Sequence, residues 1–237
     1  MTKKRIFITG VSSGLGYGLA LNYLKAGEDV WGCSRRCPND LVDLGLNFCA
    51  LDLADQKESE SAFKKWTQLV ESFEVVFLNA GVLGKIKDMR ECSVDALKSL
   101  MEVNVWSNKW LLDALFSNGC SINQVIAISS GASLSGSRGW NGYSLSKAAL
   151  NMLIKLYAGE EPNTHFIALA PGLVDTAMQD YLTALPADPR YAPLEILKAA
   201  KGTDQMPSGE VCAHTIISIV PRLLKFESGS YADIRKL

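Results

Sequence analysis

Three residues in the middle of the chain have the types and spacing of an acid–base device. Tyr143 and Lys147 are four positions apart, which places both side chains on one face of a predicted helix. Ser130 precedes them at the end of a predicted buried strand. A phenol with a pKa of about 10 is a poor acid or base at neutral pH, but a nearby ammonium group lowers that value. With a hydroxyl to hold the substrate oxygen, the set suits the interconversion of a carbonyl and an alcohol.

A glycine-rich segment, residues 9–16 (TGVSSGLG), follows the first predicted strand and opens the first predicted helix. Its glycines permit a tight turn and let a phosphate group approach backbone N–H groups at a helix N-terminus. The residues predicted to surround the phosphates are Gly10, Ser12, Ser13, Gly14, Leu15 and Gly16. Because the spacing is Gly-x-x-x-Gly-x-Gly rather than Gly-x-Gly-x-x-Gly, a purely structural turn remains an alternative.

The same segment also fits the nucleophile elbow of a serine hydrolase. Gly10 to Gly14 reads Gly-x-Ser-x-Gly around Ser12, and Asp175 and His214 follow in the chain order which that fold uses. Against this reading, an elbow normally comes after several strands, whereas Ser12 follows the first. The third glycine, Gly16, has no role in an elbow, so nucleotide binding is the preferred interpretation.

Short apolar runs alternate with longer amphipathic stretches along the chain. Strands are predicted over 5–9, 29–33, 48–51, 75–78, 124–129 and 165–170, and helices over 15–26, 58–71, 94–117 and 143–158. Near-continuous apolar strands are typical of a sheet that is covered on both faces. The sequence therefore predicts an α/β protein: a single Rossmann-type domain over 1–237, with a doubly wound parallel sheet and helices on both faces.

The pattern changes after Pro171. Residues 176–205 contain two short helical possibilities, and prolines at 186, 189 and 193 interrupt them. In a doubly wound sheet, ligands bind beyond the carboxyl ends of the strands. We expect this insert to be a substrate loop or lid, and a surface connection without a role is the alternative.

The composition excludes several classes of protein. Apolar residues make up 48% of the chain and charged residues 21%, which argues against disorder. Because 24 basic residues oppose 25 acidic ones, neither a nucleic acid nor a membrane surface is an expected partner. The six cysteines form no Cys-x-x-Cys pair, and the apolar stretch after the N-terminus is too short for a signal peptide, so we expect a soluble cytoplasmic protein. His165 and His214 are isolated, and no metal site is predicted.

Together, the motifs resemble those of the short-chain dehydrogenase/reductase family over nearly the whole chain. The glycine segment, an Asn-Ala-Gly motif at Asn79, the Ser130, Tyr143 and Lys147 set, and a Pro-Gly motif at Pro171 occur in the family's order. The resemblance implies that Tyr143 donates a proton to a carbonyl oxygen and that Ser130 orients this oxygen. Lys147 would bind the nicotinamide ribose and lower the pKa of the tyrosine.

The resemblance also assigns residues around these motifs. Asn104 would hold a water molecule in a proton relay from Lys147, with a helix-interior asparagine bonded to backbone as the alternative. Asp52, beside Leu53, would contact the adenine, although a plain turn aspartate is also possible. The residues implied to line the remainder of the cofactor are Asn79, Ala80, Gly81, Pro171, Gly172, Val174 and Thr176, the last two at the carboxamide.

The end of the second predicted strand indicates which cofactor is bound. An acidic residue there would bind both ribose hydroxyls of NAD and repel a 2′-phosphate. This chain instead has Arg35 and Arg36, with Ser13 and Ser34 as possible supporting hydroxyls. Because arginine pairs with phosphate in bidentate fashion, NADP(H) is expected in preference to NAD(H), with Arg35 as the principal contact.

The C-terminal half resembles the sepiapterin reductase and benzil reductase branch of the family. By that resemblance Asp233 matches a substrate-contacting aspartate, but it has a local alternative partner in Arg235. Trp140 precedes Tyr143 closely and is expected in an apolar pocket, together with flanking residues Leu83, Leu173, Met178 and Tyr181. The expected function is an NADPH-dependent reductase of a ketone, diketone or aromatic, pterin-like carbonyl, acting as a homodimer or homotetramer. A non-catalytic NADP-binding regulator is the alternative.

Overall fold

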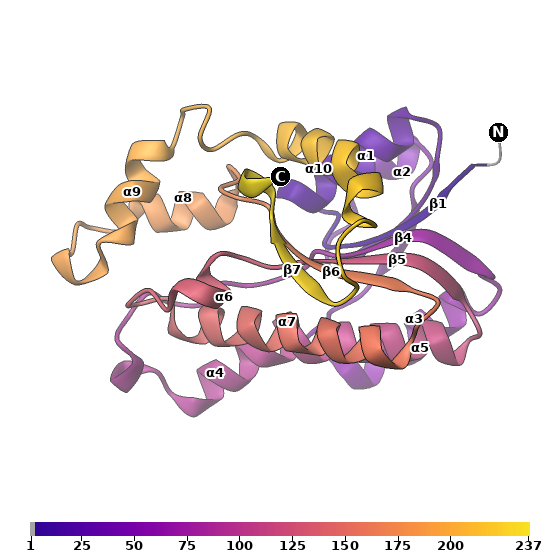
Figure 1. The fold of residues 1–237 in the computed structure, drawn as a ribbon, viewed down its shortest axis with the longest axis horizontal. Helices are drawn as coiled ribbons and strands as arrows, with labels where there is room; N and C mark the ends of the chain where they lie inside the picture. Colours follow the sequence, from indigo (N-terminus) through magenta and orange to yellow (C-terminus); the bar gives the residue numbers. More distant parts are fainter. Residues whose placement is uncertain (1–2) are drawn as a thin grey trace.

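Parallel strands form the centre of the molecule (Figure 1). The computed structural model describes residues 3–237, and these contain a seven-stranded, all-parallel sheet in the order β3-β2-β1-β4-β5-β6-β7. The strands are β1 (Arg5–Thr9), β2 (Asp29–Ser34), β3 (Asn47–Ala50), β4 (Ser72–Leu78), β5 (Ser121–Ile128), β6 (His165–Ala170) and β7 (Ser230–Asp233). The predicted α/β class, a Rossmann-type doubly wound parallel sheet, is therefore confirmed.

The predicted strands correspond to β1–β6 with small shifts at their ends. The seventh strand, β7, was not predicted. Its four residues, Ser-Tyr-Ala-Asp, contain no branched aliphatic side chain, so the segment lacks the apolar signature of a buried strand. It adds to the sheet because β6 offers it a free edge, in the register Ile167 to Ser230.

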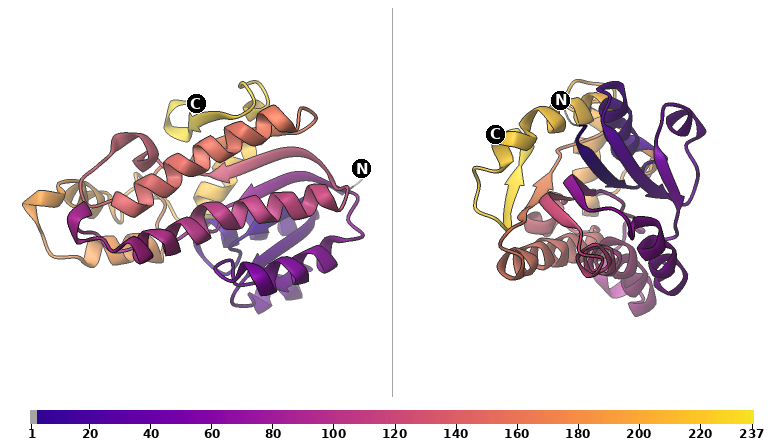
Figure 2. Two further views of the ribbon diagram at one scale, coloured as in Figure 1. Left: turned by 90° about the horizontal axis from the view of Figure 1, so that it is seen from below. Right: turned by 90° about the vertical axis from the view of Figure 1, so that its right-hand side faces the viewer.

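Helices cover both faces of the sheet (Figures 1 and 2). One face carries α1 (Gly14–Lys25), α2 (Asn39–Asp43) and α10 (Gly209–Leu223), and the other carries α3 (Gln56–Thr67), α5 (Ser107–Ser117) and α7 (Asn141–Glu160). Two shorter helices, α4 (Val94–Met101) and α6 (Ala132–Ser135), lie near the start of α7. Within residues 3–237, no helix is both long and apolar enough to span a bilayer.

The alternation of side chains along β1 divides the core into two layers. Ile6 and Ile8 pack under α1 and α10, whereas Phe7 points to the opposite face. The Phe7 ring lies 5.3 Å from that of Phe63 on α3 and 5.8 Å from that of Phe73, measured between centroids. Because both faces are buried, the strand has no polar side, which explains its continuous apolar run.

Helices α1 and α10 cross with their backbones in close contact. A β-carbon at Gly18 would lie 2.4 Å from the carbonyl oxygen of Gly209, and one at Gly209 would lie 2.5 Å from the carbonyl of Gly14. No side chain fits at these distances, so the crossing requires glycine on both helices. The C-terminal helix thus supports the first turn of α1 directly.

The single helix predicted over 94–117 is interrupted. A π-helical turn, Glu102–Trp106, separates α4 from α5. Such turns are rare and occur mainly where a side chain must be redirected at a functional site. Here the turn contains Asn104, whose contacts are described below.

The chain after β6 extends beyond the carboxyl ends of the strands, where α8 (Ala177–Ala184), a 3₁₀ turn (Pro189–Tyr191) and α9 (Pro193–Ala200) lie (Figure 1). This segment has its own apolar cluster, in which Tyr191 and Leu194 pack with Trp140 and Leu83. The insert predicted over 176–205 is therefore packed against Trp140, the residue before α7, and against Leu83.

The burial of Phe7 predicts a large stability effect. The side chain has no exposed surface and contacts two other rings, so Phe7→Ala should lower the free energy of unfolding by about 3–5 kcal/mol in urea denaturation. Leu69→Ala is the control, because Leu69 is 86% exposed. Similar losses in both variants would contradict this account of the core.

Candidate active site

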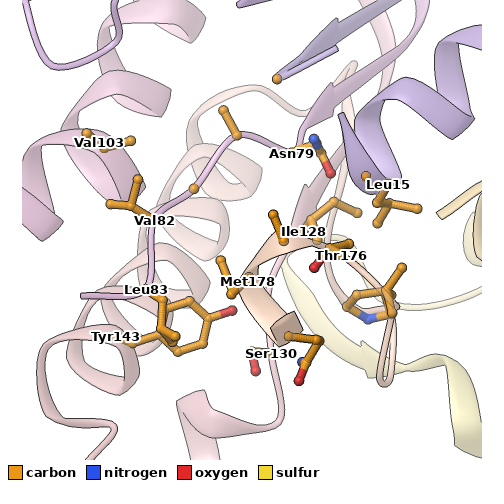
Figure 3. Close-up of a pocket in the computed structure, with 18 of the residues that line it drawn as sticks. Leu15, Asn79, Val82, Leu83, Val103, Ile128, Ser130, Tyr143, Thr176 and Met178 are labelled. Atoms are coloured by element: carbon orange, nitrogen blue, oxygen red, sulfur yellow. The ribbon is translucent and has the colours of Figure 1, made fainter. Parts of the chain in front are cut away.

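The carboxyl ends of β1, β4, β5 and β6 border one open cavity of about 560 Å³ (Figure 3). Most of the predicted site residues lie on its wall. They are Gly10, Ser12, Ser13, Gly14, Leu15, Ser34, Arg35, Asp52, Leu53, Asn79, Ala80, Gly81, Ser130, Trp140, Tyr143, Lys147, Pro171, Gly172, Val174 and Thr176. Three predicted residues, Gly16, Asn104 and Asp233, are not on the wall.

The glycine-rich turn has the backbone geometry that glycine alone adopts readily. Gly10 and Gly14 have φ angles of +78° and +58°, and α1 begins at Gly14. Gly16 lies behind the turn, where a β-carbon would come within 2.3 Å of the Gly10 carbonyl oxygen. Its role is therefore close packing of α1 against the turn. The N-terminus of α1 faces the cavity and is suited to an anion.

Thr9 connects this turn to the Asn-Ala-Gly motif after β4. Its hydroxyl oxygen accepts hydrogen bonds from the backbone N–H groups of Asn79 and Ala80, both at 2.9 Å. The Asn79 side chain donates in return to the Thr9 carbonyl, also at 2.9 Å. The two loops are thereby fixed as one unit, and both belong to the cavity wall.

The nucleophile-elbow alternative does not agree with this geometry. An elbow serine requires a strained backbone, and among residues 3–237 no residue other than glycine has a positive φ. His214 is exposed on α10, and no hydrogen bond joins it to Ser12 or Asp175 among the described residues. Ser12 therefore lies in the glycine-rich turn without the strained backbone or the partners of an elbow nucleophile.

Tyr143 and Lys147 lie one turn apart at the start of α7 and face the cavity. The Lys147 Nζ atom is 5.8 Å from the centre of the Tyr143 ring and donates to the Ile128 carbonyl oxygen at 2.7 Å. The lysine is 3% exposed, and its burial lowers the pKa of the ammonium to about 8. Burial raises the pKa of the Tyr143 phenol, while the Ser130 hydroxyl acts in the opposite direction.

Ser130 is held in the loop that follows β5. Its carbonyl oxygen accepts from the Ser133 hydroxyl at 2.7 Å, and its own hydroxyl oxygen accepts from the Ala132 N–H at 3.1 Å. Asn151 on α7 connects this loop to the helix, because it bonds to the hydroxyls of both Ser129 and Ser133. The loop and α7 are thus fixed relative to each other.

Asn104 lies behind the cavity wall and is fully buried. Its side-chain oxygen accepts from the Val82 N–H at 2.8 Å, and its side-chain nitrogen donates to the Val82 carbonyl at 2.8 Å and to the Ser146 hydroxyl at 2.9 Å. The Ser146 hydroxyl in turn donates to the Tyr143 carbonyl. From the π turn, Asn104 thus connects the loop after β4 to α7.

Several contributors to the site were not predicted. Ser146 bonds to Asn104 and to the Tyr143 carbonyl, Asn151 bonds to Ser129, and Asn108 donates to the Asn104 carbonyl at 2.9 Å. Asn108 follows Asn104 by four positions and Ser146 follows Tyr143 by three, so helical spacing was the available signal. On the apolar side, Leu83, Leu173 and Met178 line the cavity as expected, whereas Tyr181 does not; Val103, Leu182 and Leu197 are additional wall residues.

At the other end of the cavity, the wall is basic. Arg35 and Arg36 both line it and are exposed, and no ion pair engages either one among the residues described. The Ser34 hydroxyl donates to the Arg36 carbonyl at 2.7 Å, which holds the turn after β2. Asp52 lies on the wall too, where its carboxylate accepts from the Ala54 N–H and shapes its own turn.

Asp233 and Trp140 have different surroundings. Trp140 is on the cavity wall and packs with Tyr191 in the apolar cluster of the insert. Asp233, at the end of β7, is 7% exposed and pairs with Arg235, whose Nε and Nη2 donate at 2.9 and 2.6 Å. The local ion pair noted in the sequence is thus present, and the carboxylate is turned toward Arg235 rather than toward the cavity.

A glycine-rich turn at a helix N-terminus and a Ser–Tyr–Lys set share one cavity at the carboxyl edge of a doubly wound sheet, where proteins of this fold bind their ligands. The family model for short chain dehydrogenases matches residues 4–186. The chain belongs to this family of oxidoreductases, which bind a nicotinamide cofactor and act on small molecules.

Relatives of established activity match along nearly the whole chain. A benzil reductase ((S)-benzoin forming) of Bacillus subtilis (strain 168) is 27% identical over 240 residues, which cover 97% of each chain. A sepiapterin reductase of Bos taurus is 33% identical over 257 residues, covering 95% of this chain and 92% of its own. The crystal structure of the KRED1-Pglu enzyme has a TM-score of 0.85 at 26% identity and covers 97% of this chain and 100% of its own. The resemblance to the benzil and sepiapterin reductase branch is confirmed.

The buried ammonium of Lys147 predicts a pH dependence of stability. An unfolded lysine titrates near pH 10.4, whereas Lys147 in the folded chain has a pKa of about 8. Between these values the unfolded state binds more protons, so the free energy of unfolding should rise with pH, by ~1.4 kcal/mol per unit from this group. Urea denaturation from pH 8 to 10 measures the rise.

Lys147→Met is the comparison, since it keeps the length of the side chain but does not titrate. The free energy of unfolding of the wild type, relative to that of this variant, should increase from pH 8 to 10. Parallel curves would mean that the ammonium is not destabilised by burial.

Proposed function

We propose that this protein is an NADPH-dependent carbonyl reductase with Tyr143 as its general acid and base. The observation that carries the proposal is one continuous cavity, which is lined at one end by Arg35 and the glycine turn and at the other by Ser130, Tyr143 and Lys147. A cofactor along this cavity would have its phosphates at the N-terminus of α1 and its reactive ring beside Tyr143.

When bound, the reduced nicotinamide supplies a hydride to the carbonyl carbon of the substrate. The Ser130 hydroxyl, held by its loop, donates a hydrogen bond to the carbonyl oxygen and orients it toward Tyr143. The Tyr143 hydroxyl then gives its proton to this oxygen, because the oxygen becomes basic as the carbonyl is reduced. The raised pKa of the phenol keeps the proton available until that step.

Lys147 prepares the tyrosine for the next turnover. Its ammonium, with a pKa of about 8, is charged at neutral pH and favours the phenolate that remains after proton transfer. It is close to Asn104: a β-carbon at position 81 would lie 3.2 Å from the Asn104 Oδ1 atom and 3.4 Å from the Lys147 Nζ atom. This proximity supports a water-mediated relay past Asn104 that returns a proton to the site.

The choice of NADPH over NADH rests on the turn after β2. Arg35 and Arg36 line the cavity without ion-pair partners among the described residues, and no acidic residue stands at the end of β2 to repel a phosphate. A guanidinium that is not paired within the protein is available to a 2′-phosphate. Ser13, on the same wall, supplies a further hydroxyl.

The apolar wall favours a neutral aromatic ketone or diketone as substrate. Trp140, Leu83 and Met178 surround the space next to Tyr143, and the insert over 176–205 contributes further apolar side chains, which supports its role as a substrate lid. The similarity to a benzil reductase agrees with this class. A pterin-like carbonyl, suggested by the sepiapterin reductase relative, is the second candidate, although Asp233 is already neutralised by Arg235.

We also propose that the protein acts as a homodimer or homotetramer in the cytoplasm. Three exposed apolar residues, Leu145, Met152 and Leu156, form a stripe along α7, and Trp106 is exposed beside α5. A contiguous apolar stripe of this kind is typical of an interface between subunits. A non-catalytic NADP-binding regulator remains the alternative, but it would have no need of Ser130, Tyr143 and Lys147 together.

The reductase proposal predicts a large loss on removal of one hydroxyl. Tyr143→Phe should lower kcat for a diaryl diketone about 10²–10⁴-fold, the usual contribution of a general acid. NADPH absorbance measures the rate, and NADPH binding by fluorescence titration serves as the control, because the variant should still bind the cofactor. No oxidation of NADPH by the wild type with any diketone or pterin would contradict the proposal and favour the regulator.

Cofactor preference predicts a separate effect. Arg35→Ala should raise KM for NADPH on the order of tenfold or more, since it removes a charge-assisted contact to the 2′-phosphate, and should leave KM for NADH nearly unchanged. Lys65→Ala is the control, because it removes one positive charge from the exposed face of α3. Equal changes in KM for NADPH and for NADH would mean that Arg35 does not bind the 2′-phosphate.

A further inference from the structure

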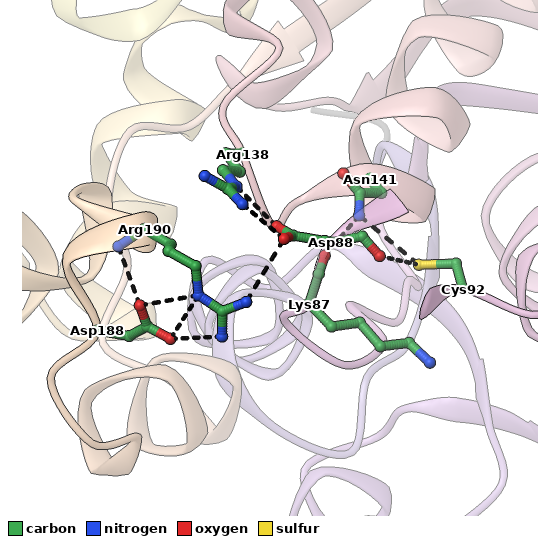
Figure 4. Close-up of polar contacts among 7 residues, drawn as sticks. All are labelled: Lys87, Asp88, Cys92, Arg138, Asn141, Asp188 and Arg190. Carbon is green, nitrogen blue, oxygen red and sulfur yellow. Dashed lines mark hydrogen bonds and ion pairs between the residues drawn. The ribbon is translucent and has the colours of Figure 1, made fainter. Parts of the chain in front are cut away.

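Four charged residues from three parts of the chain meet beside the cavity (Figure 4). Asp88 lies in the loop after β4, Arg138 lies in the loop before α7, and Asp188 and Arg190 lie in the turn between α8 and α9. None of the four is on the cavity wall. The cluster therefore connects the lid to the loops that carry the catalytic groups without contacting a substrate.

Asp88 is the centre of this cluster. Its carboxylate accepts a bidentate pair of hydrogen bonds from Arg138, from Nε at 2.7 Å and from Nη2 at 2.6 Å. The same carboxylate lies 3.5 Å from Nη1 of Arg190, whose Nε and Nη2 also contact Asp188. Asp88 is the least exposed of the four, with 24% of its side chain accessible, compared with 57% for Arg138.

Among the four residues, only Asp88 contacts both arginines. It is the carboxylate that contacts two guanidinium groups, and Arg138 holds the pKa of its carboxyl below the usual value, so it is ionised at neutral pH. Without it, Arg138 and Arg190 would face each other with like charge. Exposed ion pairs add little to global stability, so the effect expected from Asp88 is on the position of the lid.

The neighbouring contacts indicate which parts would move. The Arg190 guanidinium lies over the ring of Tyr191, 5.0 Å from its centre, and Tyr191 is buried in the apolar cluster that contains Trp140. Asn141, the first residue of α7, donates to the Lys87 carbonyl next to Asp88 at 2.5 Å. The cluster thus lies between the lid, the Trp140 side of the cavity and the start of the catalytic helix.

We propose that Asp88 is a positioning residue that fixes the lid turn over 188–191 against the loop before α7, and so sets the apolar wall that receives the substrate. Trp140, just before α7, and Leu197, on α9, both line the cavity and share one apolar cluster. Their relative position determines how well a bulky aromatic carbonyl fits. Cofactor binding, which depends on the distant glycine turn and Arg35, does not require it. The kinetic part of this inference rests on the proposed function.

Asp88→Asn tests the proposal, because asparagine keeps the size of the side chain and removes its charge. With a diaryl diketone, KM should rise about five- to tenfold, while kcat and KM for NADPH remain within twofold of the wild type. Asp88→Glu should restore KM for the diketone toward the wild-type value. Asp95→Asn is the matched control, since Asp95 pairs with Lys98 on the exposed surface of α4 and its loss should change neither constant.

Hydrogen exchange gives a second readout that needs no turnover. Amides over 186–200 should exchange faster in Asp88→Asn than in wild type, with little change elsewhere, and Asp95→Asn should behave like wild type. Should the wild type reduce no carbonyl, the proposed function fails while this measurement still tests the anchoring role. If Asp88→Asn has the same exchange rates over 186–200 and the same KM for the diketone as Asp95→Asn, the inference is overturned. A uniform rise in exchange with a parallel rise in KM for NADPH would overturn it too, since that pattern indicates a global structural role.

Discussion

The whole site depends on one joint at the point where the strand order reverses. β1 and β4 are neighbours in the sheet but lie far apart in sequence, and their loops would diverge without a connection. The Thr9 hydroxyl closes this gap by accepting two backbone N–H groups after β4, and Asn79 returns a bond to Thr9. Because these bonds between side chains and backbone hold the glycine-rich turn and the Asn-Ala-Gly loop together, the two loops form one fixed part of the cavity wall.

A second set of contacts connects the ends of the strands to Tyr143 and Lys147. The Val82 backbone, just beyond the Asn-Ala-Gly motif, is bonded on both its N–H and C=O by Asn104, and Ser146 continues the path to the backbone of Tyr143. Lys147 is placed by the Ile128 carbonyl at the end of β5. Lys147 and the backbone of Tyr143 are therefore held at the carboxyl edge of the sheet, the edge at which doubly wound proteins bind their ligands.

The sequence was sufficient for the parts of this arrangement that local chemistry determines. Apolar runs and glycine spacing predicted β1–β6 and the phosphate turn, and the helical spacing of Tyr143 and Lys147 predicted their common face. β7 was missed because its four residues carry no apolar pattern and its pairing depends on the free edge of β6. The break at Glu102–Trp106 was missed as well, because its five residues contain no glycine or proline to mark an interruption of the helix. The partners of Asp88 depend on tertiary contacts, which composition and spacing do not report, whereas the pair between Asp233 and Arg235 is local and was one of the two alternatives that the sequence offered.

The close crossing of α1 and α10 also limits how this chain can recombine with its relatives. The match to the family model ends at residue 186, so α10 lies beyond the matched part of the chain. Yet Gly209 touches the backbone of Gly14, and Gly18 touches Gly209. A chimaera that exchanges the C-terminal third between two relatives would also give the glycine-rich turn a new neighbouring helix. The exchange is compatible only when the incoming helix brings a residue without a side chain to the position of Gly209, so the first turn of α1 and the C-terminal third must be inherited together.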